Sequence, residues 1–287
     1  MTKKFGFVVL NYINYGETIE CVESILTISG NNYCIVIVDN HSPNNSFDIL
    51  SAKYKQWGNI TVLPSGRNGG YSYGNNCGIR FLESINICDV VIATSDTLVV
   101  SKDILQQLEK LDTDDVGVVG PKVMNLTNDD ENPMLFKADI GYVLNIHFPS
   151  LASILRNTYY TVTPFLKSAF RNHKDQRRKI TLSSNVYMVH GCFLYLTRHY
   201  FKKCGYLDES LFMYGEEDIF AYNCLKSNLR VLYQPTIEII HKNARSTPSM
   251  NNNSFKTINS KKSMKYLRKK LTLSTMLIHI TKKWLLM

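Results

Sequence analysis

The chain has 287 residues, enough for one large domain or two closely joined halves with a sizeable buried core. Hydrophobic residues make up 44% and charged residues 20% of the sequence, a balance that excludes an intrinsically disordered chain. The formal net charge of +9 favours anionic partners such as phosphorylated substrates, an acidic membrane face or nucleic acid.

Cysteine usage and the N-terminus bear on the compartment. The seven cysteines include no C-x-x-C pair, which disfavours a zinc site and a disulfide framework and favours a reducing environment. The N-terminal apolar run FGFVVL meets polar residues at once, so it is too short for a signal peptide or a membrane span. We therefore expect a cytosolic protein that does not cross a bilayer.

Strands and helices alternate over the first part of the chain. Short apolar runs rich in β-formers predict strands at residues 5–10, 33–40, 59–64 and 89–96. Apolar residues at helical spacing predict helices at 16–28 and 75–85, each between two of these strands. This alternation predicts a mostly parallel sheet covered on both faces, with ligands at the carboxyl ends of the strands.

The second part of the chain is less regular. A helix at 103–111 and the segment VGVVGPKV at 116–123 complete a first half, 1–124. Chain breaks and basic residues over about 125–184 predict an irregular insertion with one or two helices. Within the second half, 125–245, the insertion precedes a strand, a helix at 198–203, a helix from about Glu217 and a final strand.

The tail, residues 246–287, is polar, then basic, and then mixes Lys and Arg with Leu, Ile, Met and Trp. A helix that lies on an anionic membrane surface has this composition. So does a C-terminal helix packed on the domain with a charged outer face. Both interpretations remain open.

Two predicted strands end in a carboxylate. Asp39, in VDNHSPNNS, could accept a hydrogen bond from a ligand N–H group or only stabilise the turn. Asp96, in ATSDT, could hold Mg²⁺ or Mn²⁺, which bridges two phosphates, or cap the next helix.

A glycine-rich segment, SGRNGGYSYGNNCGI, follows the third strand. Its glycines would let the backbone approach a ligand or turn sharply before a helix, while Arg67 and Asn68 supply a positive charge and an amide. The spacing matches neither a P-loop nor a dinucleotide fingerprint, and a role in packing alone is the alternative.

Three adjacent carboxylates, Glu216, Glu217 and Asp218, occur in MYGEEDIF. Their mutual repulsion can raise a pKa and produce a general base, or they simply begin a helix, where acids are favoured. His241 follows the run TIEII, where an imidazole could serve as a ligand.

Taken in chain order, these segments resemble one family. The phrases are VVLNYINYGETIECVESI, IVDNHSPNNS, GRNGGYSYGNNCGI, SDT, HGCFLYLTRHYFKKCGYLDESLFMYGEEDI and IIH. Over roughly residues 5–245 they resemble inverting glycosyltransferases of family 2, nearest to the rhamnosyl- and galactofuranosyl-type enzymes of bacterial surface polysaccharide synthesis. The resemblance implies the Rossmann-like α/β fold called GT-A: a mixed, mostly parallel sheet flanked by helices, with an irregular insertion and a C-terminal helical tail.

The resemblance also implies roles for individual residues. Donor contacts fall on Asn11, Tyr12, Asp39, Asn68 and Asp96. The acceptor side falls on Gly191 and Cys192. The metal ligands are Asp96 and His241, and the catalytic pair is Glu217 and Asp218, of which we favour Asp218 as the base. The family's DxD motif is reduced here to Thr94-Ser95-Asp96, which weakens the expectation of a metal.

The implied halves are a nucleotide-sugar-binding half (1–124) and an acceptor-binding half (125–245), followed by a basic tail. The implied reaction moves a sugar from a nucleotide-diphosphate donor, with Mg²⁺ or Mn²⁺, to a glycan or a lipid-diphosphate-linked glycan. The enzyme would act on the inner face of the cell membrane, bound to its anionic surface.

An alternative is a catalytically inactive nucleotide-sugar-binding module. The reduced DxD favours it, whereas the retained acids and His241 argue against it. A nucleic-acid-binding protein ranks third, because the positive charge lies in the insertion and tail, away from the candidate site.

Overall fold

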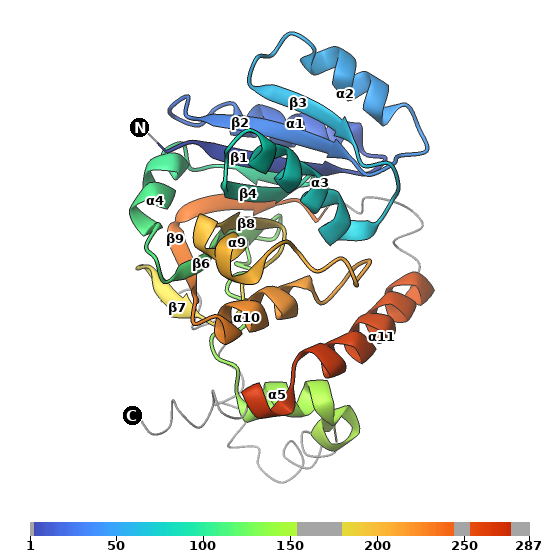
Figure 1. Cartoon of the computed structure of the whole chain (residues 1–287), viewed down its shortest axis with the longest axis vertical. Helices are drawn as coiled ribbons and strands as arrows, with labels where there is room; N and C mark the ends of the chain where they lie inside the picture. Colours follow the sequence, from blue (N-terminus) through green and yellow to red (C-terminus); the bar gives the residue numbers. More distant parts are fainter. Residues whose placement is uncertain (1–2, 154–179, 244–252, 277–287) are drawn as a thin grey trace.

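The computed structural model describes residues 3–153, 180–243 and 253–276 (Figure 1). The predicted basic cluster of the insertion lies outside the described residues: Lys167, Arg171, Lys174, Arg177, Arg178 and Lys179. The last part of the predicted tail, 277–287, also lies outside them.

Nine strands of the described residues form one mixed sheet in the order β3-β2-β1-β4-β8-β6-β9-β5, with β7 paired to β9. The strands are β1 (Phe5–Asn11), β2 (Tyr33–Asp39), β3 (Ile60–Pro64), β4 (Asp89–Thr94), β5 (Thr97–Val99), β6 (Val116–Asn125), β7 (Ser184–Val186), β8 (Phe193–Leu196) and β9 (Arg230–His241). The predicted parallel pairing holds from β3 through β4, and β8 then enters antiparallel between β4 and β6. Both predicted halves therefore contribute strands to one sheet.

The helices of the described residues include all those predicted. They are α1 (Tyr15–Ile25), α2 (Ser46–Tyr54), α3 (Gly70–Ser84), α4 (Ile104–Leu111), α5 (Ile140–His147), α9 (Arg198–Cys204), α10 (Glu216–Lys226) and α11 (Asn253–Lys270). Two of them begin at side-chain caps, because Asp139 accepts from the backbone N–H of Tyr142 in α5 and Thr197 accepts from that of Tyr200 in α9.

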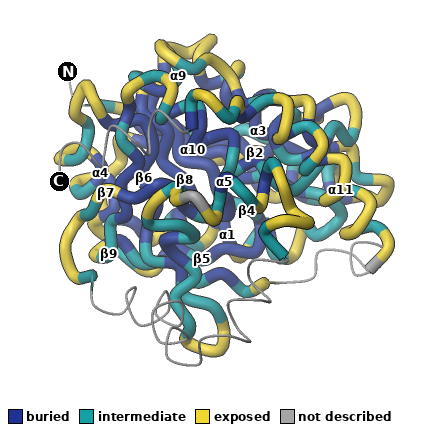
Figure 2. The backbone as a smooth tube through the Cα atoms, turned by 90° about the horizontal axis from the view of Figure 1, so that it is seen from below, coloured by how far each residue is buried: buried dark blue, intermediate teal, exposed yellow. Residues whose placement is uncertain are grey.

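The alternation of side chains along each strand gives the sheet two apolar faces. Phe5, Phe7 and Val9 of β1 cluster with apolar residues of α1, α2 and α4 on one face. Val8 clusters with residues of α3, α9 and α10 on the other. The buried backbone accordingly runs through the strands, and the exposed backbone lies in the outer loops (Figure 2).

Helix α3 begins at Gly70, so most of the glycine-rich segment is helix rather than loop. A Cβ atom on Gly74 would lie 2.4 Å from Leu10 Cδ1, and one on Gly78 would lie 2.6 Å from Val8 Cγ1. These two glycines let α3 lie directly against β1. For them, the packing alternative is correct and the ligand-approach prediction is wrong.

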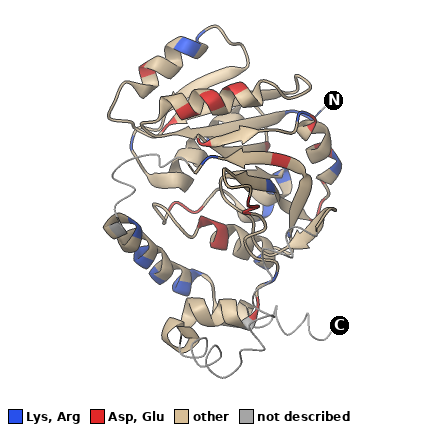
Figure 3. Ribbon diagram, turned by 180° about the vertical axis from the view of Figure 1, so that it is seen from behind, with Lys and Arg blue, Asp and Glu red and all other residues tan. Residues whose placement is uncertain are grey.

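Helices α5 and α11 form a further layer outside α10 (Figure 1). Leu267, Leu271 and Met276 are buried there, in one cluster with Ile219 of α10 and Val143 of α5. The described part of the tail is therefore a helix packed on the domain, and its exposed residues include five lysines. Figure 3 marks basic residues along this helix. Among the described residues, no helix combines the length and the apolar character needed to cross a bilayer.

Candidate functional site

A cavity of about 550 Å³ lies where β1, β2 and β4 end and α10 begins. Its volume falls in the range typical of small-molecule sites. Most of the predicted site residues line it: Tyr12, Asn68, Asp96, Gly191, Cys192, Glu217, Asp218 and His241. The fold thus brings together side chains that are more than two hundred positions apart in the sequence.

Asn11 and Asp39 lie behind the cavity wall rather than on it. Asn11 is fully buried, and its Nδ2 donates to Asp39 Oδ1 over 2.6 Å. Asp39 also accepts from the backbone N–H and the hydroxyl of Ser42, at 3.0 and 2.6 Å. In this structure the amide of Asn11 holds Asp39, and its contact with the donor stays a prediction. Asp39 has the contacts of a turn stabiliser, and its donor contact stays a prediction.

The side of the cavity at the end of β2 carries two amides. Asn40 Nδ2 donates to Asn68 Oδ1 over 3.1 Å and to the carbonyl oxygen of Gly70 over 3.2 Å. Asn68 Oδ1 also accepts from the backbone N–H of Gly70. Asn68 is therefore fixed at the start of α3, where backbone N–H groups and the helix dipole favour an anion.

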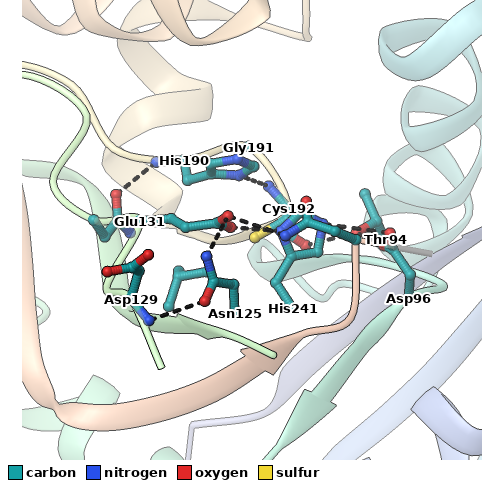
Figure 4. A network of polar contacts seen from close by, with 12 residues as sticks. Thr94, Asp96, Asn125, Asp129, Glu131, His190, Gly191, Cys192 and His241 are labelled. Carbon is teal, nitrogen blue, oxygen red and sulfur yellow. Dashed lines mark hydrogen bonds and ion pairs between the residues drawn. The ribbon is translucent and has the colours of Figure 1, made fainter. Parts of the chain in front are cut away.

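Asp96 and His241 face each other across the edge of the sheet (Figure 4). Their Oδ2 and Nε2 atoms are 3.3 Å apart. Backbone pairing sets this distance, since Thr97 of β5 opposes His241 of β9, and the N–H of Lys242 donates to the carbonyl of Asp96 over 2.9 Å. Thr94 also donates its hydroxyl to Asp96 Oδ1 over 2.7 Å.

Glu131, from the insertion, orients the His241 ring. Its Oε2 lies 2.8 Å from Nδ1 of His241, so Nδ1 carries the proton and donates it. Burial lowers the pKa of His241, but the hydrogen bonds and charges of Asp96 and Glu131 outweigh burial and raise it above its usual value. Burial raises the pKa of Asp96, and the hydrogen bond and charge of His241 bring it below its usual range.

This pair is suited to a divalent cation. Two ligand atoms at roughly 2.1 Å from one ion lie about 3.0 Å apart in octahedral and about 3.4 Å apart in tetrahedral geometry. The observed separation of 3.3 Å between Asp96 Oδ2 and His241 Nε2 lies between these limits. A carboxylate that orients a ligating histidine, as Glu131 does, is also typical of metal sites. The residues present therefore fit such an ion.

The acidic cluster begins α10 on another side of the same cavity. Tyr214 and Gly215 precede it with φ values of 71° and 96°, which turn the chain sharply into the helix. The Tyr142 hydroxyl of α5 donates to Asp218 Oδ1. Glu217 Oε1 accepts from the backbone N–H of Gly191 over 3.2 Å. Two of the three acids thus have fixed positions.

Burial separates the protonation behaviour of two of these acids. Burial raises the pKa of Asp218 to about 6, although the hydrogen bond from Tyr142 opposes the rise. Burial and the charge of Glu217 raise the pKa of Glu216 to about 8. Asp218 is therefore mostly ionised at neutral pH and poised to accept a proton, whereas Glu216 is mostly protonated.

Glu216→Gln is expected to raise the free energy of unfolding, by an amount that grows with pH. Glu216 is 7% exposed, and its Oε1 has no hydrogen-bond partner among the described residues. Its pKa is higher in the folded state, so its stabilising contribution is complete below about pH 4.5 and is lost as pH rises through about 8. Between these pH values the free energy of unfolding of the wild type falls by up to about 1.4 kcal/mol per pH unit. The glutamine variant does not have this loss, because its amide does not titrate.

Urea unfolding at pH 5, 6, 7 and 8 measures this difference. Glu23→Gln is the matched control, because the Glu23 side chain is 54% exposed and pairs with Lys53 at the surface. An advantage of Glu216→Gln that stays constant from pH 5 to pH 8 would contradict the assignment.

The comparisons with known proteins agree with this geometry. The sequence model described as "Glycosyl transferase family 2" matches residues 7–205. The chain belongs to glycosyl transferase family 2. A curated protein, the low-salt glycan biosynthesis hexosyltransferase Agl10 of Haloferax volcanii, is 26% identical to this family 2 chain over 210 residues.

Solved structures share the fold. GalNAc-T7, crystallised with UDP, GalNAc and Mn²⁺, superposes with a TM-score of 0.60 over 84% of this chain at 14% identity. Residues 1–349 of S. aureus TarS, in complex with UDP-GlcNAc, superpose with a TM-score of 0.58 over 87% of this chain at 16% identity. The mixed sheet flanked by helices is thus the GT-A-like fold of family 2 that the sequence predicted.

The family 2 chain spans part of each of these proteins. The sequence match with Agl10 includes 72% of this chain and 58% of Agl10. This chain covers 44% of the GalNAc-T7 chain and 61% of the TarS chain. The structural likenesses establish the fold, while substrates are a separate question.

Three polar residues that line the cavity or contact its side chains were missed by sequence reasoning: Glu131, Tyr142 and His190. His190 precedes the quoted Gly191-Cys192 pair, so it lay within a recognised motif. Glu131 and Tyr142 lie in the irregular insertion, where neither periodicity nor resemblance gives a signal.

Proposed function

We propose that this family 2 protein is an inverting glycosyltransferase that moves a sugar from a nucleotide-diphosphate donor to a hydroxyl of a glycan or lipid-linked glycan. One observation carries the proposal. A single cavity combines a carboxylate poised to accept a proton, Asp218, with a carboxylate–imidazole pair spaced for a divalent cation, Asp96 and His241. A base activates the acceptor hydroxyl and a cation stabilises the leaving diphosphate, so the two kinds of group together suit transfer from a diphosphate donor.

The donor would lie along the carboxyl ends of the parallel strands, where α/β sheets bind nucleotides. Tyr12 and Asn68 line that part of the cavity and would contact the nucleoside, with Asp39 behind them. Asp96 and His241 would hold Mg²⁺ or Mn²⁺ at the diphosphate. When bound there, such a cation offsets the negative charge that the leaving nucleotide gains.

Asp218 would act as the general base. It takes the proton of the acceptor hydroxyl, the acceptor oxygen bonds to the anomeric carbon, and the bond from that carbon to the diphosphate oxygen breaks on the opposite side. One displacement inverts the configuration. Glu217, which accepts from the backbone of Gly191, would position the acceptor side of the cavity, where Cys192 also lies.

The basic side of α11 supports an acceptor that carries a lipid diphosphate at an anionic membrane surface. Exposed lysines follow this helix along its length (Figure 3): Lys256, Lys261, Lys262, Lys265 and Lys269. Lysines near such a surface contribute about 1 kcal/mol each to binding. Surface polysaccharides are a product for which a membrane-bound, lipid-linked acceptor would be suited, so we include this role in the proposal. The relative Agl10 is named for glycan biosynthesis.

A screen of nucleotide sugars with the full chain tests the proposal. Release of the nucleoside diphosphate and transfer to an acceptor are followed with Mn²⁺, with Mg²⁺ and with EDTA. We expect turnover of at least one donor, a loss of at least 10²-fold in EDTA, and recovery when Mn²⁺ is restored.

Asp96→Asn should lower the affinity for Mn²⁺, measured by calorimetry, at least tenfold, because one of two proposed protein ligands loses its charge. Asp103→Asn, a surface change at the start of α4, is the control. Donor binding without turnover of any sugar would instead support the inactive binding module. Full activity in EDTA would remove the metal role of Asp96 and His241.

A further inference from the structure

His190 lines the cavity between the base and the proposed cation site, and no role is yet assigned to it. The turn His190-Gly191-Cys192 is tied to both sides. The N–H of Gly191 donates to Glu217, and the carbonyl of Cys192 accepts from the N–H of Thr94 over 2.8 Å, next to Asp96. The imidazole is therefore held close to the place where the sugar–phosphate bond of a donor would lie.

The backbone fixes this ring. The N–H of His190 donates to Asn132 Oδ1 over 2.8 Å, and Asn132 Nδ2 donates to the carbonyl of Pro121 in β6 over 2.8 Å. The N–H of Cys192 donates to His190 Nδ1 over 3.1 Å. The ring thus has little freedom to turn away from the cavity.

The last of these hydrogen bonds determines the tautomer. A backbone N–H can only donate, so Nδ1 of His190 must offer its lone pair and carry no proton. The neutral ring then has its proton on Nε2. His241 has the opposite arrangement, because its Nδ1 donates to Glu131, and a cation would take the place of the Nε2 proton that faces Asp96. His190 therefore offers a hydrogen-bond donor to the cavity, whereas His241 offers a ligand for a cation.

The tautomer of His190 determines whether His190 can bind a metal ion together with its neighbours. His190, Cys192 and His241 have potential ligand atoms within 4.8 Å of one another, as a three-ligand metal site would. His190 has no free lone pair for a metal ion, because its Nδ1 accepts a hydrogen bond from the backbone N–H of Cys192 and its Nε2 is protonated. The rings of His190 and His241 lie 5.1 Å apart between centroids, so the Nε2–H group is close to the proposed cation without binding it.

We propose that His190 donates its Nε2–H to an oxygen of the phosphate that is bonded to the transferred sugar. This inference rests on the proposed function. The bond from the anomeric carbon breaks with its electron pair on that phosphate, and a fixed donor stabilises the charge as it develops. The proton stays on Nε2 throughout, so the step needs no further reactant.

Two amide substitutions distinguish the acceptor role of Nδ1 from the donor role of Nε2. In His190→Asn, the amide oxygen can still accept from the N–H of Cys192, but nothing replaces the Nε2 donor. In His190→Gln, the longer side chain can place an N–H near the Nε2 position, while the acceptor for Cys192 is lost. His199→Gln is the control, because His199 lies near Asp112 and Asp114, away from the cavity.

With the donor that the wild type turns over, we expect His190→Asn to lower kcat by about 10²- to 10³-fold, the usual loss for one such donor. KM for the donor and the calorimetric affinity for Mn²⁺ should change less than threefold, and His190→Gln should recover at least a tenth of wild-type kcat. Higher activity in the Asn than in the Gln variant would overturn the proposal, since the turn rather than Nε2 would then matter.

A tenfold loss of Mn²⁺ affinity in both variants would also overturn it, because His190 would then be a metal ligand. Thermal unfolding of each variant shows whether a loss of kcat comes from loss of the fold. A wild-type chain that turns over no donor would overturn the proposed function itself. An active wild type with an equally active His190→Asn would remove this inference alone.

Discussion

Replacing Asp218 by asparagine is expected to lower kcat for sugar transfer by about 10²- to 10⁴-fold and to leave nucleotide binding nearly unchanged. Asparagine keeps the shape of the side chain and can accept from Tyr142, but it cannot take a proton from the acceptor. The base must be ionised, so the wild-type rate should rise with pH through about 6, to which burial raises the pKa of Asp218, and then level off.

Two further variants complete this test. Tyr142→Phe removes a hydrogen bond that lowers the pKa of Asp218, so the rising limb of the wild-type pH profile should move to higher pH. Glu217→Gln should retain more activity than Asp218→Asn. The reverse order would move the base to Glu217, and nucleotide release by Asp218→Asn at the wild-type rate would contradict the base assignment altogether.

Gly70→Ala is expected to destabilise the fold by about 2–5 kcal/mol, adding the cost of left-handed backbone to that of overpacking. Gly70 has a φ of +86°, and a Cβ atom there would lie 2.0 Å from the carbonyl oxygen of Phe212. This carbonyl belongs to backbone and accepts from the N–H of Tyr71, so it cannot rotate away. Because Phe212 leads into the acidic start of α10, kcat should fall as well.

Gly30→Ala is the matched control for this substitution. Gly30 has a φ of +99°, but a Cβ atom there would meet only Leu105 Cδ1, at an ordinary 3.7 Å. The free energy of unfolding of this variant should fall only by the cost of left-handed backbone, about 1–2 kcal/mol. Urea unfolding compares the two, and equal losses would show that the contact with Phe212 does not matter.

The parallel part of the sheet could be predicted because its strands are short apolar runs separated by helices of clear periodicity. The place of β8 could not, because FLYL looks like any buried strand, and its antiparallel position between β4 and β6 is set by tertiary packing. The start of α3 at Gly70 lies five residues before the predicted start. Gly74, which falls in this added turn, has low helix propensity, but its missing side chain is required where the helix touches β1.

The candidate site divides in the same way. Strand ends and a resemblance indicated Asp96, Asp218 and His241, since sequence order determines which polar groups follow strands. Their partners Glu131 and Tyr142 could not be predicted, because tertiary packing of the segment after β6 brings them against His241 and Asp218. The raised pKa values of Asp218 and Glu216 come chiefly from burial in the folded chain, which the sequence does not give.

The insertion therefore sets a limit on how this chain can be altered. Irregular segments at the edge of a domain are the usual choice for tags, loop grafts and exchanges between relatives. Here the stretch from Glu131 to Tyr142 carries one group that orients a histidine and another that holds a carboxylate. A graft in that stretch would disturb both chemical sides of the cavity at once, together with the hydrogen bond that Asn132 donates to the carbonyl of Pro121 in β6.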